Sequence, residues 1–218
     1  MVPSVRPPSP GVCVRVPGLV QRPGGPQYYL PCHGTDIALT IDDGPDPTWT
    51  PRILDLLGRY GVQATFCMVG KRAAAHPELV AAVAKGGHHI ANHTFTHPLE
   101  LPRLTPEQIG DEIGHASDVL ADLTGEQPTL FRSPGGNWSP AVLELCTQHG
   151  MRPLGWSVDP RDWSRPGVRH IVQTILTKTG PGSIILDHDG GGDRSQTLNA
   201  LTIALPRLLA AGYHFTQP

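Results

Sequence analysis

From residue 36 onward, short apolar runs alternate with longer segments of helical pattern, and this alternation constrains the fold more than any other feature of the sequence. Strands that alternate with helices indicate a parallel sheet, because neighbouring parallel strands need a crossover connection. The expected fold is therefore α/β, a single distorted barrel of about seven parallel strands. The predicted strands are residues 36–41, 64–69, 88–92, 129–133, 151–158, 183–188 and 213–217.

The segments between the strands carry the start signals of helices. Thr50 followed by Pro51 suits an N-cap and the first helical position, and Thr105 with Gln108 has the spacing of a capping box. Pro206 lies inside the last helical segment and should kink it. An open, doubly wound sheet is the alternative, although no G-x-G-x-x-G follows a predicted strand. Either architecture places ligands at the carboxyl ends of the strands.

The start of the chain differs in composition from the rest. Prolines occur throughout residues 1–35, which predicts an extended arm or linker ahead of one domain at 36–218. This segment has no apolar signal core, and no stretch of the chain approaches the ~18 apolar residues of a membrane span. We therefore expect either a cytoplasmic chain or a mature form whose export signal is absent. Cys13 and Cys32 flank the arm, and their spacing leaves a disulfide and free thiols as even alternatives.

Charge and histidine content narrow the function further. A formal net charge of −2 gives no basic footprint for nucleic acid, so no nucleic-acid partner is expected. The 11 histidines are many for 218 residues, and histidine is the commonest metal ligand. They hint at a metal site.

Two adjacent acids end the first predicted strand. Asp42 and Asp43 are followed by Gly44 and Pro45 in "TIDDGP". Successive side chains on a strand point to opposite faces, but a turn at Gly-Pro lets both acids lean toward one point. Two carboxylates brought that close repel, so we expect a cation or an arginine beside them.

Polar groups also follow the third and fourth predicted strands. His93 and His97 in "NHTFTHP" are four residues apart, which on a helical turn puts both imidazoles on one side. Arg132 in "FRSPGGNW" leads a tight Pro-Gly-Gly turn. Histidines at this spacing also occur by chance, and glycine-rich turns are usually only turns.

The fifth and sixth strands end in "DPRDW", residues 159–163, and "LDHDG", residues 186–190. Purely structural roles would also explain these residues. Trp163 would belong to the core, His188 would be a buried histidine with a partner, and Asp162 would cap a helix. Five such groups, all at the carboxyl ends of strands in one alternating fold, point to a functional site.

These five stretches resemble, in order and spacing, the motifs of the polysaccharide deacetylases, the NodB-homology group of carbohydrate esterase family 4. The stretches are "TIDDGP", "HTFTH", "RSPGG", "DPRDW" and "ILDHD", and the resemblance covers roughly residues 36 to 217. It implies that 36–218 is a polysaccharide deacetylase catalytic domain.

The resemblance implies a metal centre with a base beside it. Asp43, His93 and His97 would bind one divalent ion, zinc first, with cobalt, nickel or manganese as alternatives. This donor set leaves coordination positions open, as at catalytic zinc sites. Asp42 would act as general base, and Arg132 would pair with Asp42 and orient it.

The resemblance assigns the remaining roles on the acid side of the site. His188 would be the general acid that protonates the leaving amine, and Asp162 would keep His188 protonated. The Gly135 backbone N–H would share the oxyanion with the metal. Trp163 and Leu186 would line an apolar pocket for the acetyl methyl.

Three positions depart from the family pattern. Ile41 replaces the usual Phe, which we expect to be harmless, and Gly135 replaces a common aromatic, which opens the groove. Asp187 stands where the family is generally apolar. On a strand it would face away from His188, and a buried acid there needs a partner.

The resulting hypothesis is a metal-dependent hydrolase that removes N-acetyl groups from N-acetylglucosamine units of chitin-like or peptidoglycan chains. O-deacetylation, as of xylan, and cleavage of other linear amides are alternatives, since the motifs do not distinguish amide from ester. A different class is an inactive carbohydrate-binding protein, which should have lost a ligand, the base or the acid. We expect a monomer, and family analogy favours a secreted or cell-envelope location.

Overall fold

Seven parallel strands form one sheet within residues 5, 19, 22–31 and 34–218, which are those that the computed structural model describes. The strand order is β5-β4-β3-β2-β1-β6, with β7 beside β1. Each strand overlaps one predicted segment, so the α/β fold is confirmed. The strands are β1 (Asp36–Asp42), β2 (Thr65–Met68), β3 (His89–Asn92), β4 (Leu130–Phe131), β5 (Arg152–Pro153), β6 (Ile184–His188) and β7 (His214–Phe215).

The sheet curls into a distorted barrel because the chain beyond β5 reaches the opposite edge. Val158 forms a parallel bridge with Ile185 of β6. The N–H of Leu186 donates to the Val158 carbonyl at 2.9 Å, and the N–H of Ser157 donates to the Ile184 carbonyl at 2.9 Å. Sheet edges that pair in this way enclose one core and bring the strand ends onto one rim.

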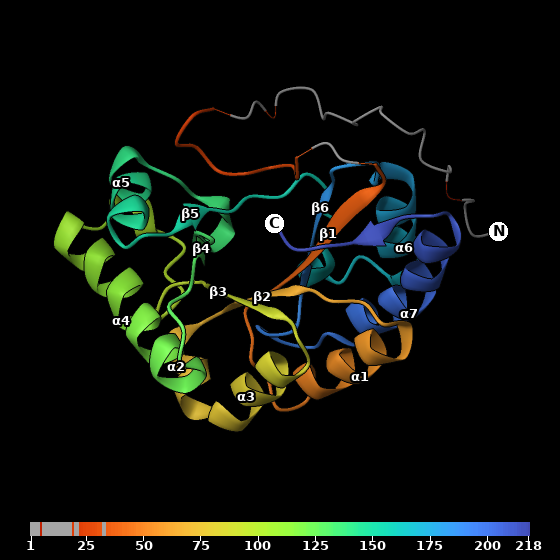
Figure 1. Cartoon of the computed structure of the whole chain (residues 1–218), viewed down its shortest axis with the longest axis horizontal. Coiled ribbons are helices and arrows are strands. Elements are labelled where there is room, and N and C mark those ends of the chain that lie inside the picture. The colour runs from red at the N-terminus through yellow and green to blue at the C-terminus, as the bar shows by residue number, and fades with distance from the viewer. Residues whose placement is uncertain (1–4, 6–18, 20–21, 32–33) are drawn as a thin grey trace.

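Helices surround the strands (Figure 1). The α-helices are α1 (Thr50–Tyr60), α2 (Gly70–Ala75), α3 (Pro77–Lys85), α4 (Pro106–Thr124), α5 (Pro140–Gln148), α6 (Val168–Lys178) and α7 (Ser195–Ala210). Short 3₁₀ turns are η1 (Leu101–Arg103), η2 (Pro134–Gly136) and η3 (Asp162–Ser164).

Helix ends follow the sequence signals with one correction. The capping box at Thr105 is confirmed, since its side chain accepts from the Gln108 N–H while the Gln108 side chain accepts from the Thr105 N–H. Thr50 is not the N-cap of α1, because Trp49 takes that place. The Thr50 hydroxyl instead donates to Asp189 at 2.5 Å, tying α1 to the end of β6. Helix α7 runs unbroken through Pro206.

Three helices occupy segments without predicted boundaries. Neither α2 nor α6 has a side chain capping its amino end, and α3 begins after His76 without a cap. Their stability comes from packing, which is common for short helices.

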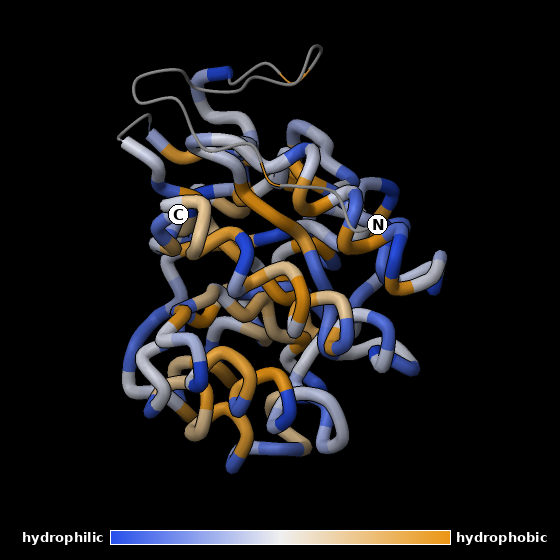
Figure 2. The backbone as a smooth tube through the Cα atoms, turned by 90° about the vertical axis from the view of Figure 1, so that its right-hand side faces the viewer, coloured by the Kyte–Doolittle hydropathy of each residue, from blue (hydrophilic) through white to orange (hydrophobic). Residues whose placement is uncertain are grey.

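The core lies between the strands and the helices. Figure 2 shows hydrophobic stretches of the chain running through the middle of the molecule. Ile37, Leu39 and Ile41 of β1 are buried in the same cluster as Ile53 of α1 and Leu201 of α7. Each such side chain contributes about 1.5–3 kcal/mol by burial.

Strand register brings the polar strand ends to one edge. Asp42 lies opposite His188 of β6 and opposite Cys67 of β2. Asn92, which precedes His93, lies opposite Met68 and Phe131. The five motifs therefore begin on the same rim of the barrel.

Among the described residues, no helix has the length and apolarity that crossing a bilayer requires. Cys13 and Cys32 lie outside the described residues, so their pairing stays untested. Cys67 and Cys146 are buried free thiols.

Candidate active site

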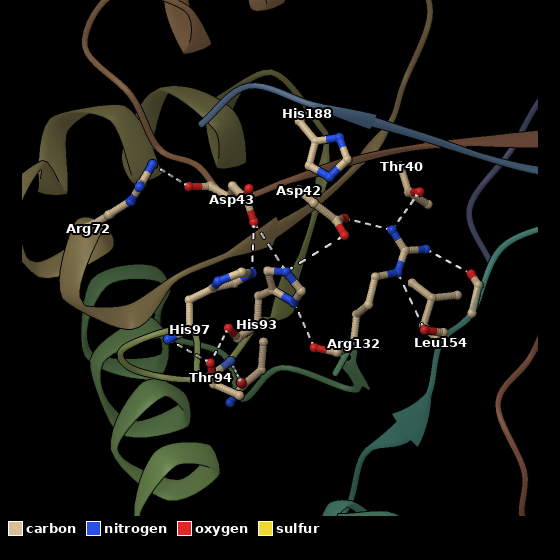
Figure 3. A network of polar contacts seen from close by, with 12 residues as sticks. Thr40, Asp42, Asp43, Arg72, His93, Thr94, His97, Arg132, Leu154 and His188 are labelled. Carbon is tan, nitrogen blue, oxygen red and sulfur yellow. Dashed lines mark hydrogen bonds and ion pairs between the residues drawn. The ribbon is translucent and has the colours of Figure 1, made fainter. Parts of the chain in front are cut away.

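Asp43, His93 and His97 converge on one point (Figure 3). Asp43 Oδ1 lies 3.4 Å from Nε2 of His93 and 3.1 Å from Nε2 of His97. Burial alone would raise the pKa of Asp43, but hydrogen bonds from the two histidines outweigh it and hold that pKa well below its usual range. Within the described part of the chain, this is the group of acids, histidines or cysteines that could hold a metal ion.

The backbone explains how two adjacent acids face one site. Asp42 ends β1 in the strand conformation, whereas Asp43 has a positive φ of 73°. His97 also has a positive φ, 65°. Such values are uncommon outside glycine and cluster at functional sites. The turn after β1 thus aims both carboxylates into the barrel mouth.

The residues at this centre fit a divalent metal. The Nδ1–H of His93 donates to the Arg132 carbonyl at 2.7 Å, and a carbonyl can only accept. This contact occupies Nδ1 and leaves Nε2, on the side of Asp43, as the ring nitrogen available to a metal ion. Two imidazole nitrogens and one carboxylate oxygen form a set suited to zinc, with positions left for water and substrate.

Helix α4 holds the turn that carries both histidines. The Glu112 carboxylate accepts from the N–H of Phe95 at 2.9 Å and from the N–H and hydroxyl of Thr96 at 2.8 and 2.5 Å. Asn92 accepts from the Thr94 N–H at 2.8 Å. No sequence signal singled out Glu112, because a glutamate on a helix is usually a solvated surface residue.

Replacing Glu112 with alanine should weaken metal binding about tenfold, the usual consequence of losing a residue that orients a ligand. Three hydrogen bonds that fix the turn before His97 would be lost. Competition with a chromophoric chelator measures the affinity. Asp111→Ala, on the neighbouring exposed position of α4, is the matched control. Equal affinities in both variants would show that Glu112 does not support the site.

Arg132 lies behind Asp42 with no exposed surface. Its Nη1 donates to Asp42 Oδ1 at 2.6 Å and to the Thr40 hydroxyl at 2.7 Å, and Nη2 donates to the Gly155 carbonyl at 2.8 Å. Burial would lower the Arg132 pKa, but the Asp42 charge outweighs burial and the pKa is raised. The cation therefore fixes one oxygen of Asp42 and leaves the other on the side of His93, at 3.7 Å from its Nε2.

His188 and Asp162 form a second buried pair. His188 Nδ1 lies 2.7 Å from Asp162 Oδ1, and the Asp162 carboxylate also accepts from the His188 N–H and the Thr197 hydroxyl. Burial lowers the pKa of His188, but the hydrogen bond and charge of Asp162, with Asp42 and Asp43, raise it to about 9. Asp162 therefore does more than begin the η3 turn, because its carboxylate also binds His188 and raises the pKa of that histidine.

A cavity of about 450 Å³ joins the two halves of the site. Its lining contains eight of the ten residues named from the sequence: Asp42, Asp43, His93, His97, Gly135, Trp163, Leu186 and His188. Arg132 and Asp162 stand behind it as hydrogen-bond partners of Asp42 and His188. All ten residues are therefore brought together, and their catalytic roles remain predictions.

Asp187 is a buried acid whose two carboxylate oxygens have no hydrogen-bond partner among the described residues. It alternates with Leu186 and His188, which line the cavity, so it faces the other side of β6 as expected. Burial raises its pKa well above the usual value, and the charges of Asp162, Asp159 and Asp42 add to that shift.

Asp187 should make the fold less stable as pH rises. Below pH ~4 the acid is protonated in both states; above that, the unfolded state ionises first, so the free energy of unfolding falls. Asp187→Asn removes this ionisation and should raise the free energy of unfolding by about 1–3 kcal/mol at pH 8, less near pH 4. Urea unfolding at both pH values measures this. A gain independent of pH would contradict the assigned cause.

The fold and the site define a class: a parallel α/β barrel with a group of donors that could hold a metal ion, and two buried ion pairs, at the carboxyl ends of its strands. The family model for polysaccharide deacetylases matches residues 31–154. The chain belongs to the polysaccharide deacetylase family, as its motifs predicted.

Relatives and solved structures agree with this assignment. The chain is 45% identical over 190 residues to a peptidoglycan-N-acetylglucosamine deacetylase of Bacillus cereus, covering 86% of this chain and 88% of that one. It is 41% identical over 189 residues to a chitooligosaccharide deacetylase of Bradyrhizobium sp., covering 81% and 86%. A crystal structure of a peptidoglycan N-acetylglucosamine deacetylase in complex with 4-naphthalen-1-yl-N-oxidanyl-benzamide superposes with a TM-score of 0.83 at 34% identity, covering 87% and 88%.

One structural neighbour is of a different kind. A carbohydrate esterase family 4 pseudoenzyme from Bacillus anthracis has a TM-score of 0.82 at 26% identity, covering 89% of this chain and 67% of that one. Membership of the family therefore does not by itself establish activity.

Proposed function

We propose that this protein is a metal-dependent hydrolase that removes N-acetyl groups from N-acetylglucosamine units of chitin-like or peptidoglycan oligo- and polysaccharides. One observation carries the proposal: the Asp42–Arg132 and His188–Asp162 pairs meet at the cavity that contains the Asp43, His93 and His97 donors. A base, an acid and a metal centre are the set that amide hydrolysis needs. The inactive alternative is disfavoured because each of these groups is present.

A divalent ion held by Asp43, His93 and His97 would polarise the acetyl carbonyl and lower the pKa of the attacking water. Zinc suits the donors best, with cobalt, nickel and manganese as alternatives.

The chain's own groups then move the protons. Asp42, oriented by Arg132, takes the proton of the attacking water. His188, with its pKa raised to about 9, is protonated at neutral pH and can give its proton to the leaving nitrogen.

Binding groups complete the proposed site. The Gly135 N–H would stabilise the negative charge that develops on the carbonyl oxygen. Leu186 is buried and Trp163 partly exposed at the cavity wall, and together they would contact the acetyl methyl.

Metal removal tests the proposal. Acetate release should be measured with chitooligosaccharides, peptidoglycan and acetylxylan, before and after treatment with a strong chelator. Acetate release from chitooligosaccharides and peptidoglycan should be lost on chelation and return with zinc. No side chain among the three donors can replace the positive charge of the metal ion. Activity that survives chelation would overturn the proposed metal dependence. Release from acetylxylan alone would indicate an O-deacetylase instead.

The same proposal covers location and assembly. We infer a catalytic domain at residues 36–218 that works as a monomer, outside the cytoplasm or in the cell envelope, as family analogy favours. Light scattering after size-exclusion chromatography tests the oligomeric state.

A further inference from the structure

Two large hydrophobic side chains are exposed in the described part of the chain, and both line the cavity over the candidate active site. Leu99 is 56% exposed and Trp163 is 47% exposed. A single exposed leucine needs no explanation, but exposed apolar side chains gathered at one cavity mark a ligand-binding surface. Trp163 belongs to a sequence motif, whereas Leu99 belongs to none.

The backbone of Leu99 is held in place. Its carbonyl accepts from Nδ2 of Asn137 at 3.0 Å. Leu99 follows β3, and Asn137 follows the η2 turn after β4, so this bond joins two loops of the rim. Leu99 Cδ2 is 3.5 Å from the place where a Cβ on Gly135 would lie. Leu99 therefore packs beside the Gly135 backbone.

Gly135 makes this arrangement possible. A Cβ at that position would lie 2.9 Å from Nδ2 of Asn137, closer than such atoms normally approach, and the positive φ of 62° also favours glycine. A larger residue at 135 would displace the amide that holds Leu99. The family commonly has an aromatic residue at position 135. Glycine at this position and the surface that Leu99 forms therefore depend on each other.

The size and chemistry of the cavity indicate its occupant. At about 450 Å³ it is large enough for a small-molecule ligand, and much larger than an acetyl group. A pyranose ring has an apolar face of C–H groups that packs on apolar side chains. Leu99 is two residues beyond His97, so it lies on the rim next to the donor group.

We propose that Leu99 forms a subsite for the apolar face of a sugar ring adjacent to the ring that loses its acetyl group, and that Asn137 is a positioning residue that holds Leu99 there. This subsite rests on the proposed function, because the neighbouring ring is part of the same oligosaccharide. Oligomers would therefore gain binding energy at Leu99 that a single sugar unit lacks.

Steady-state kinetics on N-acetylglucosamine, on its oligomers of two to six units and on 4-nitrophenyl acetate test the subsite, because only the oligomers carry a ring beside the one that loses its acetyl group. Leu99→Ala should lower kcat/KM for the oligomers about tenfold, relative to the monomer and the ester. The loss should arise mostly through KM, since an interaction made equally in ground and transition states acts on KM. Leu99→Met should retain most of the preference. Asn137→Asp, which replaces the donor by an acceptor, should show the same loss on the oligomers.

Leu143→Ala is the matched control, because Leu143 is a half-buried leucine of α5 outside the cavity, and it should behave as wild type. A Leu99→Ala loss that is equal for all substrates, or no loss, would overturn the subsite. Wild-type protein that hydrolyses the ester but no oligomer, or that hydrolyses nothing, would overturn the proposed function itself, and the subsite with it.

Discussion

Replacing Asp42 with asparagine is expected to lower kcat by about 10²–10⁴, the usual contribution of a general base. An asparagine has the same shape, and its Oδ1 can still accept the Arg132 hydrogen bond that now measures 2.6 Å. It cannot take a proton from water. The fold and the metal affinity should therefore change little, while the chemical step slows.

Asp43→Asn is the matched comparison, because the two acids are adjacent. Asp43 faces His93 and His97, so its replacement should weaken metal binding first and reduce activity through loss of the ion. Metal content after dialysis, thermal unfolding and acetate release separate the two effects. If the two variants exchanged these phenotypes, the roles assigned to the adjacent acids would be reversed.

Asp162→Asn should move the alkaline limb of the pH–rate profile to lower pH. The general acid must be protonated, and the His188 pKa of about 9 depends on the hydrogen bond and charge of Asp162. With that charge removed, burial would dominate and lower the pKa, so His188 would lose its proton at lower pH. At pH 8 the rate should fall by about 10².

The pH profile of kcat/KM from pH 5 to 10 provides the test. The acid limb should move little, because Asp42 and the donor group lie elsewhere in the cavity. Thr197→Val is a control, since it removes a different hydrogen bond to Asp162 and keeps the charge. A stationary alkaline limb with a shifted acid limb would show that Asp162 serves only the structure of η3.

Much of the fold could be predicted because its signals are local. Alternation of apolar runs with helical patterns identified the strands, and "LTPEQ" identified the start of α4. Signals were absent where helices form by packing alone, as in α2 and α6. Thr50 shows a second limit, because its hydroxyl binds Asp189, far away in sequence, instead of capping α1.

The candidate site likewise contains residues that the sequence identified and residues that only the structure revealed. Its ten residues could be named because each lies within a short motif at the end of a predicted strand, where side-chain type and spacing carry the chemistry. Glu112, Asn137 and Leu99 could not, since their contribution depends on contacts between segments that no local pattern relates.

By itself, the sequence determined the parallel α/β architecture, the family and the set of candidate site residues, because these depend on periodicity and on short motifs. Only the tertiary structure decided how these residues act on one another. Strand register set His188 opposite Asp42, and the closing of the barrel placed Asp162 against His188. The hydrogen bond and charge of Asp162 then raise the pKa of His188 against the effect of burial, and this depends on distances across the fold, which the order of residues does not specify.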